Sequence, residues 1–86
     1  MPYRIELLPE AEDNLDRLDA VLAGRILGKL EWFAERIDQL SPEALTGRYQ
    51  GLYRLRVGSY RVIYDIDRRG QVIVVHAARH RREAYR

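Results

Sequence analysis

The stretch from Leu52 to Tyr64, LYRLRVGSYRVIY, constrains the fold more than any other part of the chain. Apolar and basic residues alternate on both sides of Gly58-Ser59, a pattern typical of two strands joined by a two-residue turn. Successive side chains of a strand point to opposite faces, so one face of this hairpin is apolar and the other carries arginines. The segments before the hairpin are therefore expected to cover its apolar face.

A two-residue turn also fixes which residues of the hairpin face each other. It places Val57 opposite Tyr60 and Arg56 opposite Arg61. A further turn at residues 67–70, DRRG, would add a third strand in which His76 faces Arg61. Like charges directly opposite each other destabilise a sheet by up to about 1 kcal/mol, which favours a bound anion there. The face predicted to lie away from the helices carries Arg54, Arg56, Arg61 and His76, although these side chains could instead extend into solvent with Asp65 and Glu83 as counter-ions.

The residues before the hairpin predict a strand and two helices. Tyr3 to Leu7 alternates like a half-buried strand, and Pro9 suits the first turn of a helix. Apolar residues then recur at helical spacing, with a break at Gly24 and an end near Leu40. Residues 43–51 carry turn residues without periodicity. The prediction is an α+β fold in which an N-terminal strand, a helical hairpin and a three-stranded antiparallel meander follow in order, the helices packing on one face of a mostly antiparallel four-stranded sheet.

The length and composition limit the classes of protein that this chain can belong to. Its 86 residues predict one domain, residues 1–86, and without cysteine neither a disulfide framework nor a thiolate metal site is possible. No run of about 18 apolar residues is present, and the N-terminus lacks the pattern of a signal peptide, so a cytoplasmic location without membrane contact is expected. Trp32 lies off the apolar stripe of its helix, and is either packed under the following loop or exposed as an anchor for a partner.

Charge is divided unequally between the two halves of the chain. Residues 1–45 hold 10 acidic and 5 basic side chains, whereas residues 46–86 hold 3 acidic and 10 basic ones. All but one of the 15 cationic side chains are arginine, whose planar fork suits phosphate groups. The ending HAARHRREAYR places further arginines and a tyrosine beside the basic hairpin, a mixture typical of an RNA or phosphate site.

The order of the elements, the segment LYRLRVGSYRVIYDID and the ending HRREAYR resemble the RelE branch of the RelE/ParE toxin superfamily. The resemblance implies the toxin of a type II toxin–antitoxin module, a ribosome-dependent endoribonuclease that cleaves mRNA in the A site. The implied partners are the ribosome, mRNA and a RelB-like cognate antitoxin with an acidic or amphipathic segment. The alternatives are a ParE-like inhibitor of DNA gyrase without RNase activity, or a weakly active relative that binds its antitoxin as a co-repressor.

The resemblance also assigns roles to individual residues. Arg54 and Arg56 match positions that bind and orient mRNA phosphates, and Arg61 matches the arginine that stabilises the developing charge. The H-R motif matches Arg81 and Tyr85 to the family's tail arginine and tyrosine, although gapless counting back from Tyr85 would select Arg79. Arginine transfers protons poorly, so the candidates for acid and base are Tyr85, His76, His80 and Glu83. No cluster has metal-ligand spacing, and no metal or other cofactor is expected.

Overall fold

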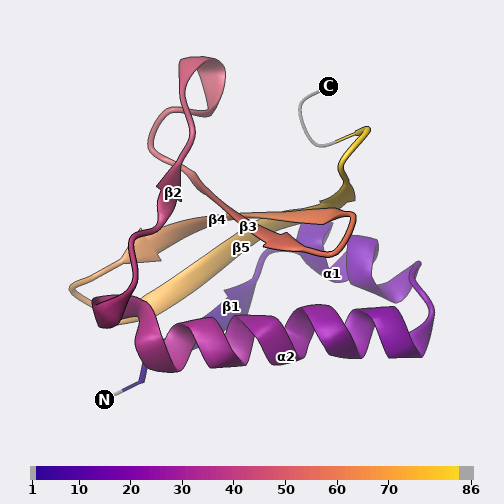
Figure 1. The fold of residues 1–86 in the computed structure, drawn as a ribbon, viewed down its shortest axis with the longest axis horizontal. Coiled ribbons are helices and arrows are strands. Elements are labelled where there is room, and N and C mark those ends of the chain that lie inside the picture. The colour runs from indigo at the N-terminus through magenta and orange to yellow at the C-terminus, as the bar shows by residue number, and fades with distance from the viewer. Residues whose placement is uncertain (1, 84–86) are drawn as a thin grey trace.

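The computed structural model describes residues 2–83, which form a five-stranded sheet with a long helix across one face (Figure 1). The α+β fold predicted from the sequence is confirmed. In chain order the elements are β1 (Arg4–Leu7), α1 (Pro9–Asp16), α2 (Ala20–Arg36), the 3-10 helix η1 (Ile37–Gln39), β2 (Glu43–Ala44), the 3-10 helix η2 (Gly47–Tyr49), β3 (Tyr53–Val57), β4 (Tyr60–Asp67) and β5 (Val72–His80).

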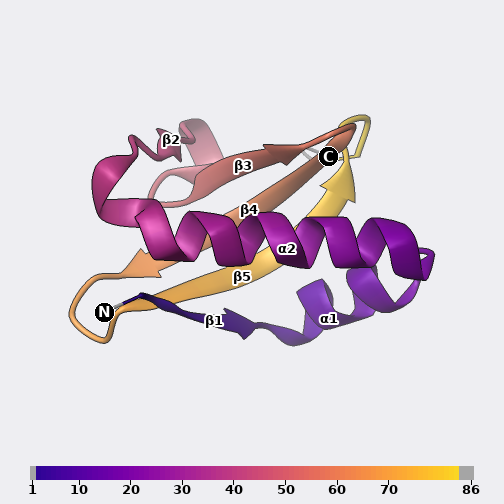
Figure 2. The same cartoon turned by 60° about the horizontal axis from the view of Figure 1, so that its bottom comes forward.

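The strands lie in the order β1-β5-β4-β3-β2, and Figure 2 shows α2 running across them. The pairs β2–β3, β3–β4 and β4–β5 are antiparallel, whereas β1 is parallel to β5. The sequence predicted four strands, because two residues are too short to display the alternation that marks a strand. The fifth strand, β2, lies within the segment that was expected to be an irregular loop.

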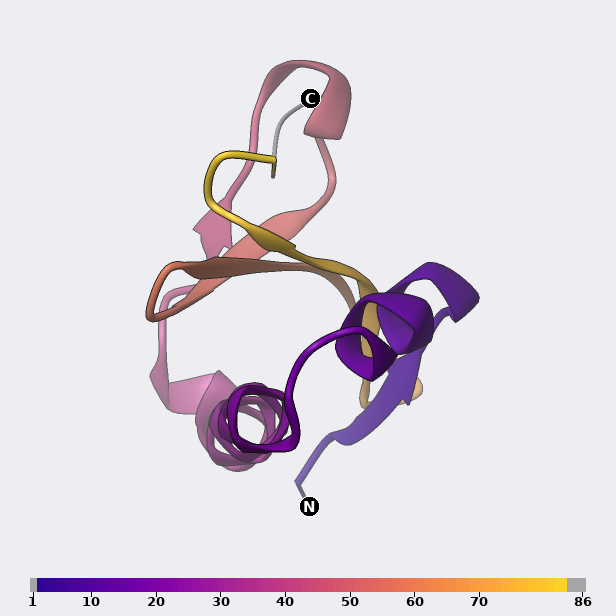
Figure 3. The same cartoon turned by 90° about the vertical axis from the view of Figure 1, so that its right-hand side faces the viewer.

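The core lies between α2 and the sheet face that it covers. Ile26, Leu30 and Phe33 of α2 are buried against strand residues that include Tyr64 and Val62. The ring of Phe33 meets that of Tyr64 edge-on at 5.4 Å between centroids. Viewed along the sheet in Figure 3, α2 lies below it, and the loop around η2 rises above it together with the chain that follows β5. The face of the sheet opposite α2, which we call the upper face, is therefore not covered by that helix.

The break between the two helices was placed wrongly by the sequence prediction. α1 ends at Asp16 and α2 begins at Ala20, so Gly24 lies inside a continuous helix. Asp19 caps the second helix, and its carboxylate accepts a hydrogen bond of 2.9 Å from the backbone N–H of Leu22. This bond satisfies a backbone donor that the first helical turn leaves free. The stabilisation from this cap is larger than the modest cost of placing Gly24 inside a helix.

The pairing predicted for β3 and β4 is confirmed, with Val57 opposite Tyr60 and Arg56 opposite Arg61. The pairing predicted for β4 and β5 is wrong, because Arg61 faces Arg79 and not His76. Two features cause the shift. The turn holds residues 68–71, with Gln71 in the left-handed region at a φ of 56°, and the register slips once more between residues 63 and 64 of β4, where His76 is left unpaired.

The N-terminal segment lies along most of β5. β1 pairs with residues 72–75, and the backbone N–H of Leu8 donates to the carbonyl of Val75 at 2.9 Å. Beyond Val75, α1 lies beside β5, and the side-chain oxygen of Asn14 accepts a hydrogen bond of 3.0 Å from the backbone N–H of Ala78. Within residues 2–83, neither helix has the length and apolar character needed to cross a membrane.

Candidate functional site

The upper face of the sheet carries two adjacent cross-strand rows of side chains. One row consists of Arg56, Arg61 and Arg79, which come from β3, β4 and β5. The neighbouring row runs from β2 to β5 and consists of Glu43, Arg54, Ile63 and Ala77. Neighbouring strands lie about 4.8 Å apart, so four guanidinium groups share a small area. We call Arg54, Arg56, Arg61 and Arg79 the arginine cluster.

Two carboxylates lie against the arginine cluster. Glu43 of β2 accepts a hydrogen bond from Arg54 and lies 3.7 Å from a guanidinium nitrogen of Arg56. The hydrogen bond from Arg54, together with the positive charges of the cluster, lowers the pKa of Glu43 below its ordinary value of 4.5. At the other side of the cluster, Glu10 of α1 pairs with Arg79. Glu43 is therefore ionised at neutral pH, and both carboxylates occupy positions that an anionic ligand could take.

Arg61 stands apart from the other arginines of the cluster. In the part of the chain that the structure describes, its side chain makes no ion pair and no hydrogen bond, and its Nε atom is buried without a partner. A buried donor left unsatisfied costs free energy, which a bound acceptor would recover. The centre of the arginine row is thus a position suited to an anionic oxygen.

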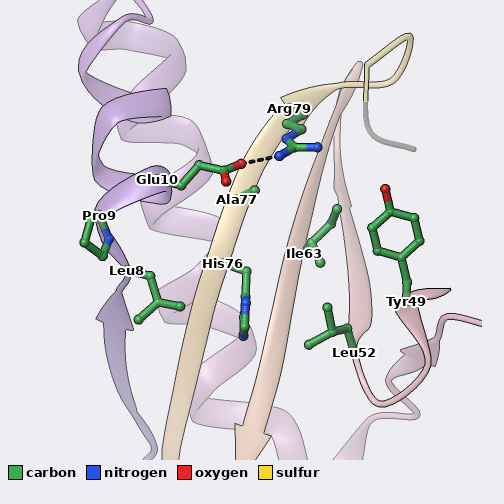
Figure 4. A pocket seen from close by; sticks show the side chains of 9 residues that line it. All are labelled: Leu8, Pro9, Glu10, Tyr49, Leu52, Ile63, His76, Ala77 and Arg79. Atoms are coloured by element: carbon green, nitrogen blue, oxygen red, sulfur yellow. Dashed lines mark hydrogen bonds and ion pairs between the residues drawn. The ribbon is translucent and has the colours of Figure 1, made fainter. Parts of the chain in front are cut away.

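A cavity of about 340 Å³ opens beside the arginine cluster on the same face (Figure 4). Tyr49 from η2 lies on one side and Leu8 and Pro9 on the other, with Ile63 and His76 between them. The ion pair between Arg79 and Glu10 lies at its edge, as the dashed line in Figure 4 shows. The cavity therefore joins an apolar floor to the charged cluster.

No three histidine or carboxylate side chains among residues 2–83 lie close enough together to hold a metal ion. The acidic residues near the face are separated, since Glu43 lies on β2 and Glu10 on α1. The chemistry that these residues offer is charge neutralisation by guanidinium groups, with carboxylate and imidazole groups to move protons.

Comparison with known protein families identifies the family to which the chain belongs. Residues 5–85 match the family model described as ParE toxin of type II toxin-antitoxin system, parDE. The chain belongs to the RelE/ParE family of type II toxins. No sequence among the curated proteins matches it significantly.

Solved structures of RelE proteins resemble this toxin over nearly its whole length. In the toxin–antitoxin complex RelBE2 from Mycobacterium tuberculosis, the similar chain is 26% identical with a TM-score of 0.71, covering 93% of this chain and 99% of that one. The archaeal RelE–RelB complex from Pyrococcus horikoshii gives 27% identity and a TM-score of 0.70, with 98% and 100% covered. A free E. coli RelE mutant shares the fold at 19% identity, with a TM-score of 0.79 and coverages of 98% and 88%.

Against this family, the structure distinguishes between the two tail arginines. Arg79 lies on β5 directly opposite Arg61, within the cluster. Arg81 follows the strand, is exposed, and donates its backbone N–H to the carbonyl of Ser59 in the β3–β4 turn at 2.8 Å. The fold therefore places Arg79, and not Arg81, beside Arg61. Tyr85 lies outside the described residues.

The acid and base candidates are separated by the sheet. His76 lines the cavity on the arginine face. His80 lies on the opposite face of the sheet beside Tyr60, and the two rings meet edge-on with 5.5 Å between their centroids. The exposed Glu83 follows in the turn after β5. Of these three candidates, His76 is the one that the fold brings to the arginine cluster.

Sequence reasoning did not select the residues Glu43, Glu10 and Tyr49. Each comes from a segment without strand alternation, and each reaches the face through tertiary contacts. The signal that could have found Glu43 is its position as the last acidic residue before a stretch of basic ones, next to the first predicted basic strand.

Proposed function

We propose that this toxin is a ribosome-dependent endonuclease that cleaves mRNA in the A site and uses the arginine cluster to bind the scissile phosphate. The observation that carries the proposal is the unpartnered, buried Nε of Arg61 between Arg56 and Arg79. Guanidinium groups match phosphate oxygens in shape and keep their charge at all physiological pH values. Three of them in one row suit a phosphate that gains negative charge during reaction.

The reaction proposed is attack by the RNA's own 2′-hydroxyl on the neighbouring phosphorus. The bond from O2′ to phosphorus forms, the bond from phosphorus to O5′ breaks, and the products carry a 2′,3′-cyclic phosphate and a 5′-hydroxyl. A base must take the proton of the 2′-hydroxyl and an acid must supply one to O5′. Arg61 and Arg79 stabilise the charge that builds up on the non-bridging oxygens between these two proton transfers.

Two described side chains on the arginine face are suited to the proton transfers. Glu43 is ionised at neutral pH, since Arg54 and its neighbours keep its pKa below the ordinary value of 4.5, and it is therefore in the form that accepts a proton. His76 lies at the far side of the same cross-strand row, next to Ala77. We assign proton acceptance to Glu43 and proton donation to His76, with Tyr85 as a further donor that the resemblance of the sequence to the family implies.

Replacing Arg61 by alanine tests the proposal directly. Loss of this guanidinium is expected to lower cleavage on translating ribosomes by about 10²- to 10³-fold, the usual effect of removing one transition-state donor. Primer extension on mRNA from cells that express each variant would map the cut sites. Arg69→Ala is the matched control, because Arg69 is exposed in the β4–β5 turn, outside the cluster. Equal A-site cleavage by the wild type and Arg61→Ala would refute the proposal.

Inhibition of DNA gyrase is the second candidate function, because the matching family model is named for ParE toxins. An inhibitor of this kind would need no cluster aligned for phosphate chemistry. Purified toxin that causes gyrase-dependent DNA breaks, while mRNA stays intact, would establish this function in place of RNA cleavage.

The partner proposed for the toxin is a cognate antitoxin with an acidic segment that crosses the arginine cluster. The cluster is partly neutralised by the carboxylates of Glu43 and Glu10, and an antitoxin carboxylate placed at Arg61 would complete that pattern. Two similar chains, 26% and 27% identical to this one, are found in the toxin–antitoxin complex RelBE2 and in the archaeal RelE–RelB complex. Their presence in such complexes supports the proposal.

A further inference from the structure

We propose that Glu10 on α1 is a positioning residue, which holds the guanidinium of Arg79 in the orientation that meets the scissile phosphate. This inference rests on the proposed RNA cleavage and adds to it a residue that acts through Arg79. The observation behind it is the ion pair between the two side chains, which lie 69 positions apart in the chain and meet at the edge of the arginine cluster (Figure 4).

The helix that carries Glu10 is a fixed support. Its residues Ala11 and Leu15 are buried in the core, with 0% and 6% of their surface exposed. A side chain on a helix that is anchored in this way starts from a defined backbone position, and sites built on such elements are more precise than sites built on loops. The carboxylate of Glu10 therefore meets Arg79 from a rigid element.

Glu10 and Asn14 both contact the end of β5. They are four residues apart, which places them on the same side of α1. The side chain of Asn14 accepts a hydrogen bond of 3.0 Å from the backbone N–H of Ala78. Glu10 accepts a hydrogen bond from the guanidinium of Arg79, the residue that follows. The first contact sets the position of the strand, and the second sets the direction of the side chain.

The contact with Glu10 leaves part of the Arg79 guanidinium for a ligand. The Nη2 atom bonds to the carboxylate, whereas the Nε and Nη1 atoms make no hydrogen bond to any of residues 2–83. A guanidinium is planar and its N–H donors form a rigid fork, so holding one nitrogen also restricts the direction of the others. Arg79 can therefore bind Glu10 and a phosphate oxygen at the same time.

The arginine row gives a reason for such support. Arg79 lies directly opposite Arg61, and like charges that face each other across two strands repel. Ordering a long side chain also costs conformational entropy. The Arg79 side chain is 29% exposed, against 59% for Arg56 at the other end of the row. The ion pair with Glu10 opposes the repulsion and orders Arg79 before RNA binds, so this cost is not added to the reaction barrier.

The test measures cleavage by excess toxin, freed of antitoxin, on ribosomes that carry an mRNA codon in the A site. The rate at saturation reports the reaction, and the half-saturating concentration reports binding. Glu10→Ala is expected to lower the saturating rate about 10- to 100-fold, since a misplacement of about 1 Å can cost about 10²-fold. The half-saturating concentration should not rise. Glu10→Gln, whose amide oxygen can accept the same hydrogen bond, should restore most of the rate.

Two controls separate positioning from a general structural effect. Glu12→Ala removes another exposed carboxylate from the first turn of α1 and should behave as the wild type. In an Arg79→Ala background, Glu10→Ala should lower the rate no further, because the guanidinium through which it acts is absent. A further loss in that background would overturn the proposal, as would a glutamine variant as slow as the alanine variant. Tighter binding without a slower rate in Glu10→Ala would show that Glu10 only competes with the phosphate, and would overturn it as well.

A second measurement tests the positioning without any RNA cleavage. NMR relaxation of the arginine Nε–H groups in the free toxin reports how ordered each side chain is. Glu10→Ala should lower the order of Arg79 and leave that of Arg56 unchanged. If this loss is seen in a toxin that cuts no mRNA, the positioning stands and the proposed function fails. If Arg61→Ala abolishes cleavage while Glu10→Ala changes neither rate nor order, the proposed function stands and the positioning is refuted.

Discussion

Glu43 was given no role from the sequence, and the structure places it against the arginine cluster. Its carboxylate bonds to Arg54 and lies near Arg56, so in the free protein it occupies part of the surface that a phosphate would use. Because its side chain is 47% exposed, the ion pair is partly screened by solvent and is not a major source of stability. Under the proposed function, Glu43 competes with the anionic ligand and accepts the proton.

Replacing Glu43 by glutamine should separate these two effects. Without the competing carboxylate, affinity for an uncleavable RNA is expected to rise about two- to fivefold at low salt, the range of an exposed ion pair. Cleavage by the same variant should fall by about 10²- to 10⁴-fold, the usual contribution of a positioned base. Fluorescence anisotropy would measure binding, and primer extension would measure cleavage. Weaker binding together with normal cleavage would contradict both parts.

The pH dependence of this variant has a defined sign. The folded state lowers the pKa of Glu43, so the stability that its ion pair contributes is present above the ordinary value of 4.5 and is lost as the pH falls through the lower folded value. The difference in free energy of unfolding between the wild type and Glu43→Gln should therefore shrink in acid below pH 4.5. Urea unfolding at a series of pH values would reveal this trend.

At the scale of elements, β5 decides which residues enter the site. The register slip at His76 places Arg79 opposite Arg61, and it leaves His80 on the face with Tyr60. The end of this strand has β1 beside it only as far as Val75, after which α1 lies alongside. Asn14 on α1 thus holds the part of β5 that carries Arg79.

Loss of the Asn14 side chain should loosen this end of β5. Asn14→Ala leaves the half-buried N–H of Ala78 without its acceptor, which is expected to lower the free energy of unfolding by about 1–2 kcal/mol. Amide hydrogen exchange at Ala78 should become at least tenfold faster than in the wild type. Asn14→Asp keeps an acceptor oxygen in place and is the control. The idea fails if the aspartate variant loses as much protection at Ala78 as the alanine variant does.

At the scale of the whole molecule, the fold sorts charge onto separate surfaces. The acidic first half supplies both α1 and α2, whereas the basic second half supplies β3, β4 and β5. The two halves meet at the ion pairs of Glu43 and Glu10 with the arginine cluster. A positive face with anchored side chains attracts anionic partners from a distance, and salt screens that attraction.

Association with the acidic antitoxin proposed above should therefore depend strongly on salt. Raising the ionic strength from 0.05 to 0.5 M is expected to lower the association rate constant at least tenfold, as for other electrostatically steered pairs. Stopped-flow mixing would measure the rate. The double variant Arg54→Ala/Arg56→Ala should show a weaker salt dependence, and Arg68→Ala/Arg69→Ala in the distant turn should behave as the wild type. A rate that does not change with salt would exclude the electrostatic part of this partnership.

Local patterns in the sequence were sufficient to predict the meander, the covering helices and the pairing of β3 with β4. Alternation specifies a strand, helical spacing specifies a covering helix, and a two-residue turn leaves one possible register, so Arg54, Arg56 and Arg61 were placed correctly. The sequence by itself therefore determined the fold class, the family and three of the four arginines of the cluster.

The rest of the site, namely Arg79 and the residues around the cluster, depended on contacts between distant segments. The sequence of β5 gives no sign of the bulge at His76, and the residues that pair with Arg54 and Arg79 lie 11 and 69 positions away in the chain. The tertiary structure alone decided that Arg79 faces Arg61, that Glu43 and Glu10 lie against the cluster, and that Tyr49 borders a cavity. The physical reason is that side-chain spacing fixes which face a residue occupies, whereas packing of β2, α1 and η2 against the sheet fixes what that face meets.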